Sequence, residues 1–210
     1  MKLIPQSHEI LDPIDGLAIL KKIEKIGRVC YKSEDRTTDY SCYSFVSNLI
    51  KRGHEAILEH VSITVRFSTN RRVSHELVRH RLCSFAQESQ RYVDYEGQEM
   101  EFIDLRPHMK YDSSKCFWEE ECADTENAYL ALRGVNDEEP EPPQIAGGVL
   151  SNDVATTVIV TANLRQWRHV LNLRAVGTTG APHPQMRELM LPLLDEFKKR
   201  IPVIFDDLTV

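Results

Sequence analysis

The sequence has no hydrophobic run that approaches the roughly 18 apolar residues needed to cross a membrane. Its N-terminus, MKLIPQSHEI, also lacks the apolar block of a signal peptide. These two absences predict a cytoplasmic protein that is not inserted into a membrane.

Motifs for disulfides, zinc and dinucleotides are also missing. The five cysteines are odd in number and form no CxxC pair, which argues against a disulfide framework or a thiolate zinc site. The segment HEAILEH resembles the zinc motif HExxH, but Leu58 stands where the second histidine belongs, so no metal is expected. Gly147 and Gly148 do not belong to a GxGxxG sequence after a strand, which excludes a Rossmann dinucleotide site.

The composition is that of an ordinary soluble domain. Hydrophobic residues make up 41% and charged residues 28% of the chain, and 210 residues suit one domain, residues 1–210. The net charge of −6 argues against a general nucleic-acid binder. Residues 61–92 nevertheless carry a charge of +4, against −10 for the rest, which indicates a local anion site.

Hydrophobic periodicity predicts alternating helices and strands. Period-2 alternation predicts a strand over 60–68, and two further apolar segments predict strands over 100–105 and 155–162. Helices are expected over 17–31, over 40–53 ending at Gly53, and from a cap at Asn70 through Leu82. A loop at 83–92 that leads to a strand is expected next. Later helices are expected from a cap at Ser113 or Ser114 to Gly134, from Asn163 to about Ala175, and over 184–200. Together these elements predict an α+β fold.

The segment NDEEPEPPQ, residues 136–144, is acidic and rich in proline. This composition predicts a connection, a candidate boundary between two lobes, because it cannot form a packed element.

The most specific motif is Arg79-His80-Arg81, followed after seven residues by Ser89 and then by Arg91. Neighbouring helix residues point about 100° apart, so three consecutive ionisable side chains cannot all face one core. A solvated helix end would explain a basic cluster alone. Here the arginines gather where the helix gives way to a loop, beside the amides of Gln87 and Gln90, which suits a phosphate that carries a base.

This motif resembles the signature of flavin-dependent thymidylate synthases. The likeness extends over residues 20–205, through Gly53-His54-Glu55 and Glu59-His60 upstream and Asn163-Leu164-Arg165 and Asn172-Leu173-Arg174 downstream. The resemblance implies a mainly antiparallel sheet flanked by helices, and a homotetramer whose active sites are each assembled from several chains.

The resemblance also implies the chemistry. dUMP would be methylated with 5,10-methylenetetrahydrofolate as the one-carbon donor, and FAD reduced by NADPH would supply the hydride. The residues that it assigns to FAD are Ala56, Glu59, Arg79, His80, Arg81, Gln87, Asn163, Arg165 and His169. Those that it assigns to the nucleotide are Glu76, Arg79, Gln87, Glu88, Ser89, Gln90, Arg91 and Arg174. Arg174 and His54 are the expected catalytic residues.

Periodicity alone leaves two explanations for the position of Arg174 on an apolar face. It falls on one helical stripe with Leu164, Trp167 and Leu171, and a buried guanidinium there needs either a structural ion pair or an anionic ligand. The resemblance favours the ligand, because the corresponding arginine contacts the pyrimidine and stabilises its ionised form. No cysteine has the Pro-Cys-His setting of the flavin-free synthases, so no cysteine attack on the base is expected.

The sequence departs from the family at two positions. Ala56 stands where many members have threonine, and Gly147 stands where an arginine usually grips the nucleotide phosphate. Either Arg91 with another arginine such as Arg168 holds that phosphate, or the substrate is another nucleotide such as UMP or dCMP. Two rival classes also stay open, a nucleic-acid-binding basic helix and a purely structural protein.

Overall fold

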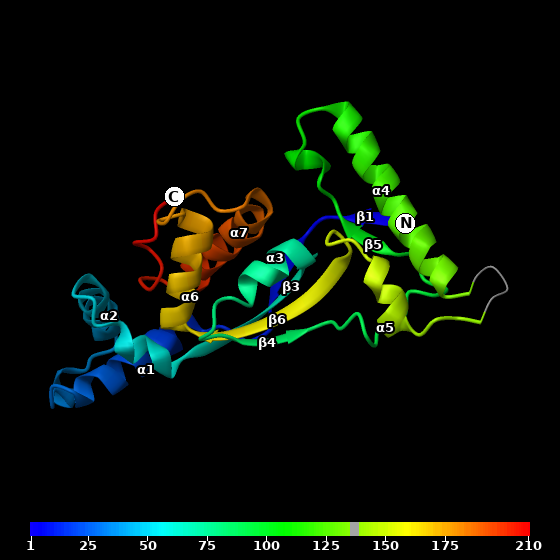
Figure 1. The fold of residues 1–210 in the computed structure, drawn as a ribbon. Coiled ribbons are helices and arrows are strands. Elements are labelled where there is room, and N and C mark those ends of the chain that lie inside the picture. Colours follow the sequence, from blue (N-terminus) through cyan, green and yellow to red (C-terminus); the bar gives the residue numbers. More distant parts are fainter. Residues whose placement is uncertain (135–138) are drawn as a thin grey trace. The chain divides into compact units, whose positions relative to one another are not determined.

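The computed structural model describes residues 1–134 and 139–210 (Figure 1). Contacts between residues divide the chain into two compact units. Unit 1 comprises Met1–Ser7, Arg66–Arg79 and Phe85–Ile159, and unit 2 comprises His8–Val65, His80–Ser84 and Val160–Val210. The expected single domain stays a prediction.

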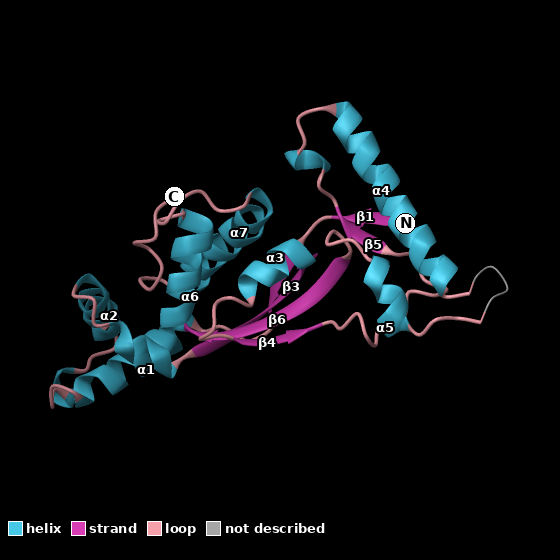
Figure 2. Ribbon diagram, in the orientation of Figure 1, coloured by secondary structure: helices cyan, strands magenta, loops and turns pink. Residues whose placement is uncertain are grey.

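A four-stranded sheet in the order β2-β3-β6-β4 connects distant parts of the sequence. Its strands are β2 (Ser7–Ile10), β3 (Ser62–Asn70), β6 (Ala155–Asn163) and β4 (Ser84–Gln87), drawn in magenta in Figure 2. Backbone bonds from Leu164 to Val61 and from Arg71 to Asn152 show that β3 and β6 run antiparallel. Both long strands bury alternate residues, which for β3 confirms the period-2 prediction.

Unit 1 contains a smaller sheet and the longest helix. β1 (Lys2–Ile4) pairs in parallel with β5 (Glu101–Ile103), and the helices are α3 (Arg71–Leu77), α4 (Asp112–Leu132) and α5 (Pro143–Ala146). Short 3₁₀ turns cover Arg106–His108 and Gly147–Val149. The core of this unit gathers Phe102, Trp118, Tyr129 and Val154 with their neighbours.

A buried carboxylate connects three elements of unit 1. Asp153 accepts hydrogen bonds from Trp118 Nε1 at 3.0 Å and from Asn70 Nδ2 at 3.4 Å, and it forms an ion pair with Arg72 at 3.1 Å. A buried carboxylate with several donors is stabilised, whereas removal of its partners would leave an uncompensated charge. Asp153 therefore ties α3 and α4 to the segment before β6.

Unit 2 is mostly helical. Its helices are α1 (Gly16–Val29), α2 (Ser41–Lys51), α6 (Leu164–Leu171) and α7 (Pro184–Arg200), with 3₁₀ turns at Glu34–Arg36 and η2 (Glu55–His60). α1 packs against α2 and η2, and α6 packs against η2 and α7. Trp167 and Phe197 meet edge to face at 5.7 Å in the core.

Several details differ from the sequence predictions. α3 ends at Leu77 and not at Leu82. Ser113 and Ser114 lie inside α4, whose first residue is Asp112 and whose N-cap, Tyr111, makes no side-chain capping bond. The predicted loop at 83–92 contains strand β4, which was too short to show a periodicity of its own. In the predicted connection, residues 136–138 lie outside the described residues, 139–142 form no helix or strand, and 143–144 begin α5.

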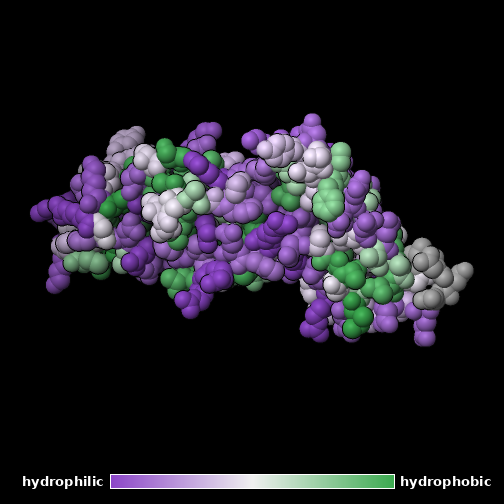
Figure 3. Space-filling view, turned by 45° about the horizontal axis from the view of Figure 1, so that its top comes forward, coloured by the Kyte–Doolittle hydropathy of each residue, from purple (hydrophilic) through white to green (hydrophobic). Residues whose placement is uncertain are grey.

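Hydrophilic side chains cover most of the face drawn in Figure 3, interrupted by hydrophobic patches. Within residues 1–134 and 139–210, no helix is both long and apolar enough to cross a membrane.

Candidate functional site

A cavity of about 700 Å³ lies in unit 2 where η2 faces α6. Four of the nine residues expected at the flavin line it, namely Glu59, Asn163, Arg165 and His169. Its other lining residues are Glu55, Leu82, Gln166, Arg168, Asn172 and Leu208. Residues from four separate parts of the sequence therefore contribute to one hollow.

The start of α6 explains how its polar residues reach this cavity. Asn163 ends β6 and caps the helix, because its Oδ1 accepts the backbone N–H of Gln166 at 2.9 Å. Arg165 and His169 follow at a spacing of four residues, so both lie on the exposed face while Trp167 points into the core. The predicted cap is confirmed.

Arg165 already has a carboxylate partner in the cavity. Its guanidinium lies 2.6 Å from Glu59 Oε1, and the two side chains are 52% and 46% exposed. An ion pair so open to water contributes little to stability, about 0–1 kcal/mol. Its effect is to hold two polar groups at the cavity wall.

Arg168 is held much more tightly than its neighbour. It forms ion pairs with Glu55 at 3.0 Å and with Asp207 at 2.7 Å, and its side chain is only 8% exposed. Two carboxylates compensate its charge. Arg168 is therefore already paired within the protein, and its expected help in holding a nucleotide phosphate stays a prediction.

His80 and Arg174 meet in unit 2 although 94 residues separate them. Arg174 Nε donates to His80 Nε2 at 3.1 Å, and the ring of His169 lies edge-on to that of His80 at 6.1 Å. Burial, together with the charges of Arg174 and His169, lowers the pKa of His80 to about 4. His80 is consequently neutral at physiological pH and can accept the bond from Arg174.

The backbone around Arg174 departs from the expected α-helix. α6 ends at Leu171, and a π-helical turn follows over Asn172–Val176. Wider turns of this kind shift the direction of later side chains, and they occur often at functional sites. Arg174 is half-buried, whereas Leu164, Trp167 and Leu171 are fully buried, so it leaves the predicted stripe.

The nucleotide residues at 87–91 all belong to unit 1. Gln87 Nε2 donates to Ser74 Oγ at 2.9 Å, and Glu88 Oε2 accepts the backbone N–H of Thr157 at 3.1 Å. The guanidinium of Arg91 lies over the ring of Tyr92, at 5.5 Å from its centroid. Gln87 and Glu88 are thus tied to the protein, while Arg91 is exposed.

The remaining expected residues differ in their surroundings. Arg79 and Arg81 are exposed, and Glu76 is half-buried on α3. Ala56 is exposed in η2, and His54 Nδ1 lies 3.3 Å from the hydroxyl of Tyr31. Neither Ala56 nor His54 lines the 700 Å³ cavity.

Gly147, which replaces an arginine of the family pattern, lies against an expected nucleotide residue. A Cβ atom built on Gly147 would stand 3.2 Å from the backbone oxygen of Gln90. A Cβ atom built on its neighbour Gly148 would have no heavy atom within 4 Å. Any side chain at position 147 would therefore press on the 87–91 segment.

Comparison with known proteins decides the family. A family model described as "Thymidylate synthase complementing protein" matches residues 17–203. The chain belongs to this family. Relatives named flavin-dependent thymidylate synthase include one from Corynebacterium aurimucosum, 33% identical over 200 residues that cover 88% of this chain and 78% of the relative. Another, from Pyrococcus furiosus, is 29% identical over 193 residues and covers 90% and 75% of the two chains.

Solved structures confirm the mixed helix and sheet fold of this thymidylate synthase family. The UMP/dUMP methylase PolB from Streptomyces cacaoi, bound with 5-Br UMP, superposes with a TM-score of 0.77 at 18% identity, over 98% of this chain and 95% of PolB. The PolB structure with 5-Br dUMP gives the same TM-score at 21% identity, over 98% and 96% of the two chains. The family model and the named relatives, and not this likeness of fold, show that the chain is an enzyme of the flavin-dependent thymidylate synthase family.

Sequence reasoning did not identify every residue of the cavity in this family member. Asn172 lines it and lies three residues beyond His169, a helical spacing that could have signalled a shared face. Leu82 and Leu208 gave no such signal, because an apolar side chain near a ligand looks the same in sequence as one in the core.

Proposed function

We propose that this enzyme methylates dUMP to dTMP, with 5,10-methylenetetrahydrofolate as the one-carbon donor and FAD reduced by NADPH as the source of hydride. The observation that carries the proposal is the cavity in unit 2. Four residues that the sequence motifs assign to the flavin line this one hollow of about 700 Å³. That volume lies within the range of small-molecule sites, about 300–1,000 Å³.

The chemistry of the cavity fits a flavin. Asn163, Arg165 and His169 offer amide, guanidinium and imidazole groups, which suit the polar edges and phosphates of the cofactor. Leu82 and Leu208 offer apolar surface for a flat ring system. When bound, FAD would supply the hydride that completes the methyl group.

Exposed arginines support a role in phosphate binding. Among the residues that the structure describes, Arg79, Arg81 and Arg91 have no carboxylate partner, in contrast to Arg165 and Arg168. A guanidinium without such a partner can form bidentate hydrogen bonds to phosphate. We assign Arg91, together with Ser89, to the phosphate of the nucleotide.

Arg174 is assigned to the pyrimidine ring. A guanidinium near the ring lowers the cost of negative charge there, so that C5 can attack the one-carbon electrophile without a protein nucleophile. The bond from Nε to His80 holds the guanidinium in one orientation. Fixed charges of this kind stabilise a transition state because they need no reorganisation during the reaction.

The proposed enzyme is a homotetramer, with each active site assembled from several chains. In that arrangement the nucleotide residues of one chain serve a site completed by others, and a single chain has no activity.

Gly147 supports a second candidate substrate, UMP. The usual phosphate arginine is absent here, and Arg168 is already paired with Glu55 and Asp207. PolB, which shares the fold, is described as a UMP/dUMP methylase. A weaker phosphate site leaves more of the nucleotide selectivity to contacts with the sugar and the base.

The deciding experiment measures turnover of dUMP and UMP by the FAD-reconstituted protein, with methylenetetrahydrofolate and NADPH supplied. Formation of dTMP with a higher kcat/KM for dUMP supports the proposal. A preference for UMP would reassign the substrate within the same chemistry, and no methylation of either nucleotide would refute the assigned reaction.

A further inference from the structure

A second hollow of unit 2 lies between α1 and α2, away from the residues assigned to the flavin. It has a volume of about 420 Å³ and shares no lining residue with the 700 Å³ cavity. Its lining residues are Arg28, Tyr31, Lys32, Ser33, Asp35, Arg36, Phe45, Asn48, Leu49 and Arg52. The hollow, here called the α1–α2 groove, is large enough for a nucleotide-sized ligand.

One wall of the α1–α2 groove is held together by an ion pair and a stacked ring. Arg28 is buried, its Nη2 lies 2.6 Å from Glu24, and its guanidinium lies over the ring of Phe45 at 4.9 Å from the centroid. Gly27 allows this close approach, since a Cβ there would stand 2.7 Å from Phe45. The ion pair and the stacked ring therefore form a wall that needs no ligand for its own stability.

The rim of the groove is different, because its cations have no partners. Lys32, Arg36 and Arg52 are exposed, and none makes an ion pair or a side-chain hydrogen bond within the described part of the chain. Arg28, the fourth cation of the lining, differs from them because it is paired with Glu24. Three uncompensated cations around one hollow are suited to a ligand with more than one negative charge.

The other groups of the groove suit a nucleoside. Tyr31 and Phe45 provide aromatic surface on which a base can stack, and Asn48 provides an amide that can read its edge. Asp35 is the one carboxylate of the lining, and it can accept a hydrogen bond from the 3′-hydroxyl that a 2′-phosphorylated ribose keeps.

The groove also connects with a residue of the expected reaction centre. The hydroxyl of Tyr31 lies 3.3 Å from Nδ1 of His54, which the sequence motifs place among the catalytic residues. A ligand in the groove would therefore lie close to His54.

From these observations we propose that the α1–α2 groove binds the phosphorylated adenosine end of the reduced nicotinamide co-substrate, with Lys32, Arg36 and Arg52 on its phosphates. The inference rests on the proposed function for the identity of the co-substrate. The chemistry of the groove does not depend on the proposed function, because the three cations and the aromatic wall determine it.

The test uses the FAD-reconstituted protein and adenosine 2′,5′-bisphosphate as the probe, in calorimetric titrations. Arg36→Gln and Arg52→Gln should each weaken binding of the probe about tenfold, since each removes a charged hydrogen bond. Adenosine without phosphate should bind much more weakly than the bisphosphate. In turnover assays the same variants should raise the KM for NADPH about tenfold with little change in kcat.

A matched control removes an exposed arginine outside the groove. Arg187 on α7 is exposed and has no ion pair among the described residues, so Arg187→Gln changes the net charge equally and should leave probe binding unchanged. Equal weakening in the control would reduce the effect to general electrostatics and overturn the proposal. No binding of the probe at millimolar concentration would also overturn it.

Flavin binding separates the groove from the flavin site. If Arg36→Gln weakened binding of FAD rather than of the bisphosphate, the groove would belong to the flavin and the proposal would be wrong. If the parent protein bound the bisphosphate but not FAD, the proposed function would fail while the assignment of a phosphate-binding groove stood.

Discussion

At the scale of single residues, contacts between neighbours in the sequence could be predicted, whereas contacts between distant residues could not. The cap at Asn163 was predictable because it depends only on neighbours along the chain. The partners of Arg168 and Arg174 were not, since Asp207 and His80 lie far away in sequence. Periodicity placed Arg174 on the buried stripe, and the π-helical turn that moves it away has no signal in the residue pattern.

Arg174→Ala should reduce kcat about 10²–10³-fold, because it removes a fixed charge from the transition state. Binding of FAD should persist, since Arg174 does not line the 700 Å³ cavity. Turnover and flavin absorbance measured on one preparation separate the two effects. Full activity in the variant would contradict the assigned role, and loss of folding would indicate a structural one.

His80→Gln should make the protein more tolerant of acid. The folded-state pKa of His80, about 4, lies below the ordinary value of 6.5, so its contribution to stability is complete above pH 6.5 and decreases as the pH falls toward 4. Glutamine keeps an acceptor for Arg174 but does not titrate in this range. Chemical unfolding at pH 7 and pH 4.5 should show a smaller loss for the variant than for the parent, and equal losses would count against a neutral His80.

Gly147→Arg should bind dUMP at least about tenfold more tightly than Gly147→Ala, which corresponds to about 1.4 kcal/mol. The alanine variant is the control, because both carry the Cβ that would stand 3.2 Å from Gln90, and only one adds the charge. The backbone at Gly147 is helical, with φ −59°, a conformation that does not itself require glycine. Equal affinities of the two variants would mean that other groups already satisfy the phosphate.

At the scale of elements, long periodic segments were predicted well and short or irregular ones were not. The prediction of residues 184–200 matches α7 to the residue, and the long strands β3 and β6 were predicted to within about two residues. β4 and the parallel pairing of β1 with β5 were missed, because three or four residues cannot show a period. The pairing of β1 also depends on a strand about 100 residues later in the chain.

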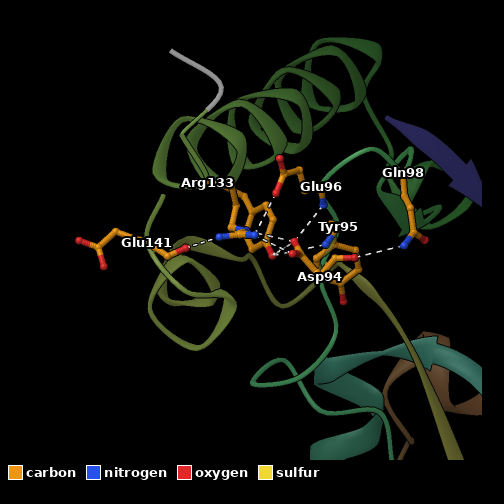
Figure 4. Close-up of polar contacts among 7 residues, drawn as sticks. Asp94, Tyr95, Glu96, Gln98, Arg133 and Glu141 are labelled. Atoms are coloured by element: carbon orange, nitrogen blue, oxygen red, sulfur yellow. Dashed lines mark hydrogen bonds and ion pairs between the residues drawn. The ribbon is translucent and has the colours of Figure 1, made fainter. Parts of the chain in front are cut away.

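One element junction has an electrostatic anchor that the sequence did not reveal. Arg133, at the end of α4, contacts Asp94 at 2.7 Å and Glu96 at 2.9 Å, and its Nη1 donates to the backbone oxygen of Glu141 (Figure 4). The hydroxyl of Tyr129 donates to Asp94 at 3.1 Å. The anchor therefore fixes the loop that follows the nucleotide residues 87–91.

Arg133→Met should lower Tm at pH 7 by about 2–4 °C. The hydrogen bond from Arg133 holds the pKa of Asp94 below its ordinary value. The contribution of the pair is therefore present above the ordinary carboxyl pKa and is lost as the pH falls through the lower folded value. The gap in Tm between parent and variant should shrink below about pH 4.

Lys115→Met provides the comparison on the same helix. Lys115 pairs with Asp112 at 2.8 Å, but Asp112 is 93% exposed, so its loss should leave Tm unchanged. An equal effect of the two substitutions, or a gap for Arg133→Met that stays constant in acid, would exclude a special role for the anchor.

At the scale of the whole molecule, the proposed active site is one that a single chain forms only in part. The residues assigned to FAD and to the nucleotide come from both compact units, and the proposed tetramer completes each site with other chains. Light scattering should give four times the mass of one chain. Specific activity should fall when the protein is diluted to concentrations at which that mass decreases, and full activity of a monomer would contradict the shared site.

The central claim is that this protein binds FAD and an uridylate nucleotide beside it. The most direct measurement is the visible absorption spectrum of the purified protein after reconstitution with FAD, followed by titration with dUMP. Retained flavin bands that shift on addition of dUMP, but not of thymidine without phosphate, are the predicted result. A protein that stays colourless with FAD at micromolar concentrations would contradict the claim.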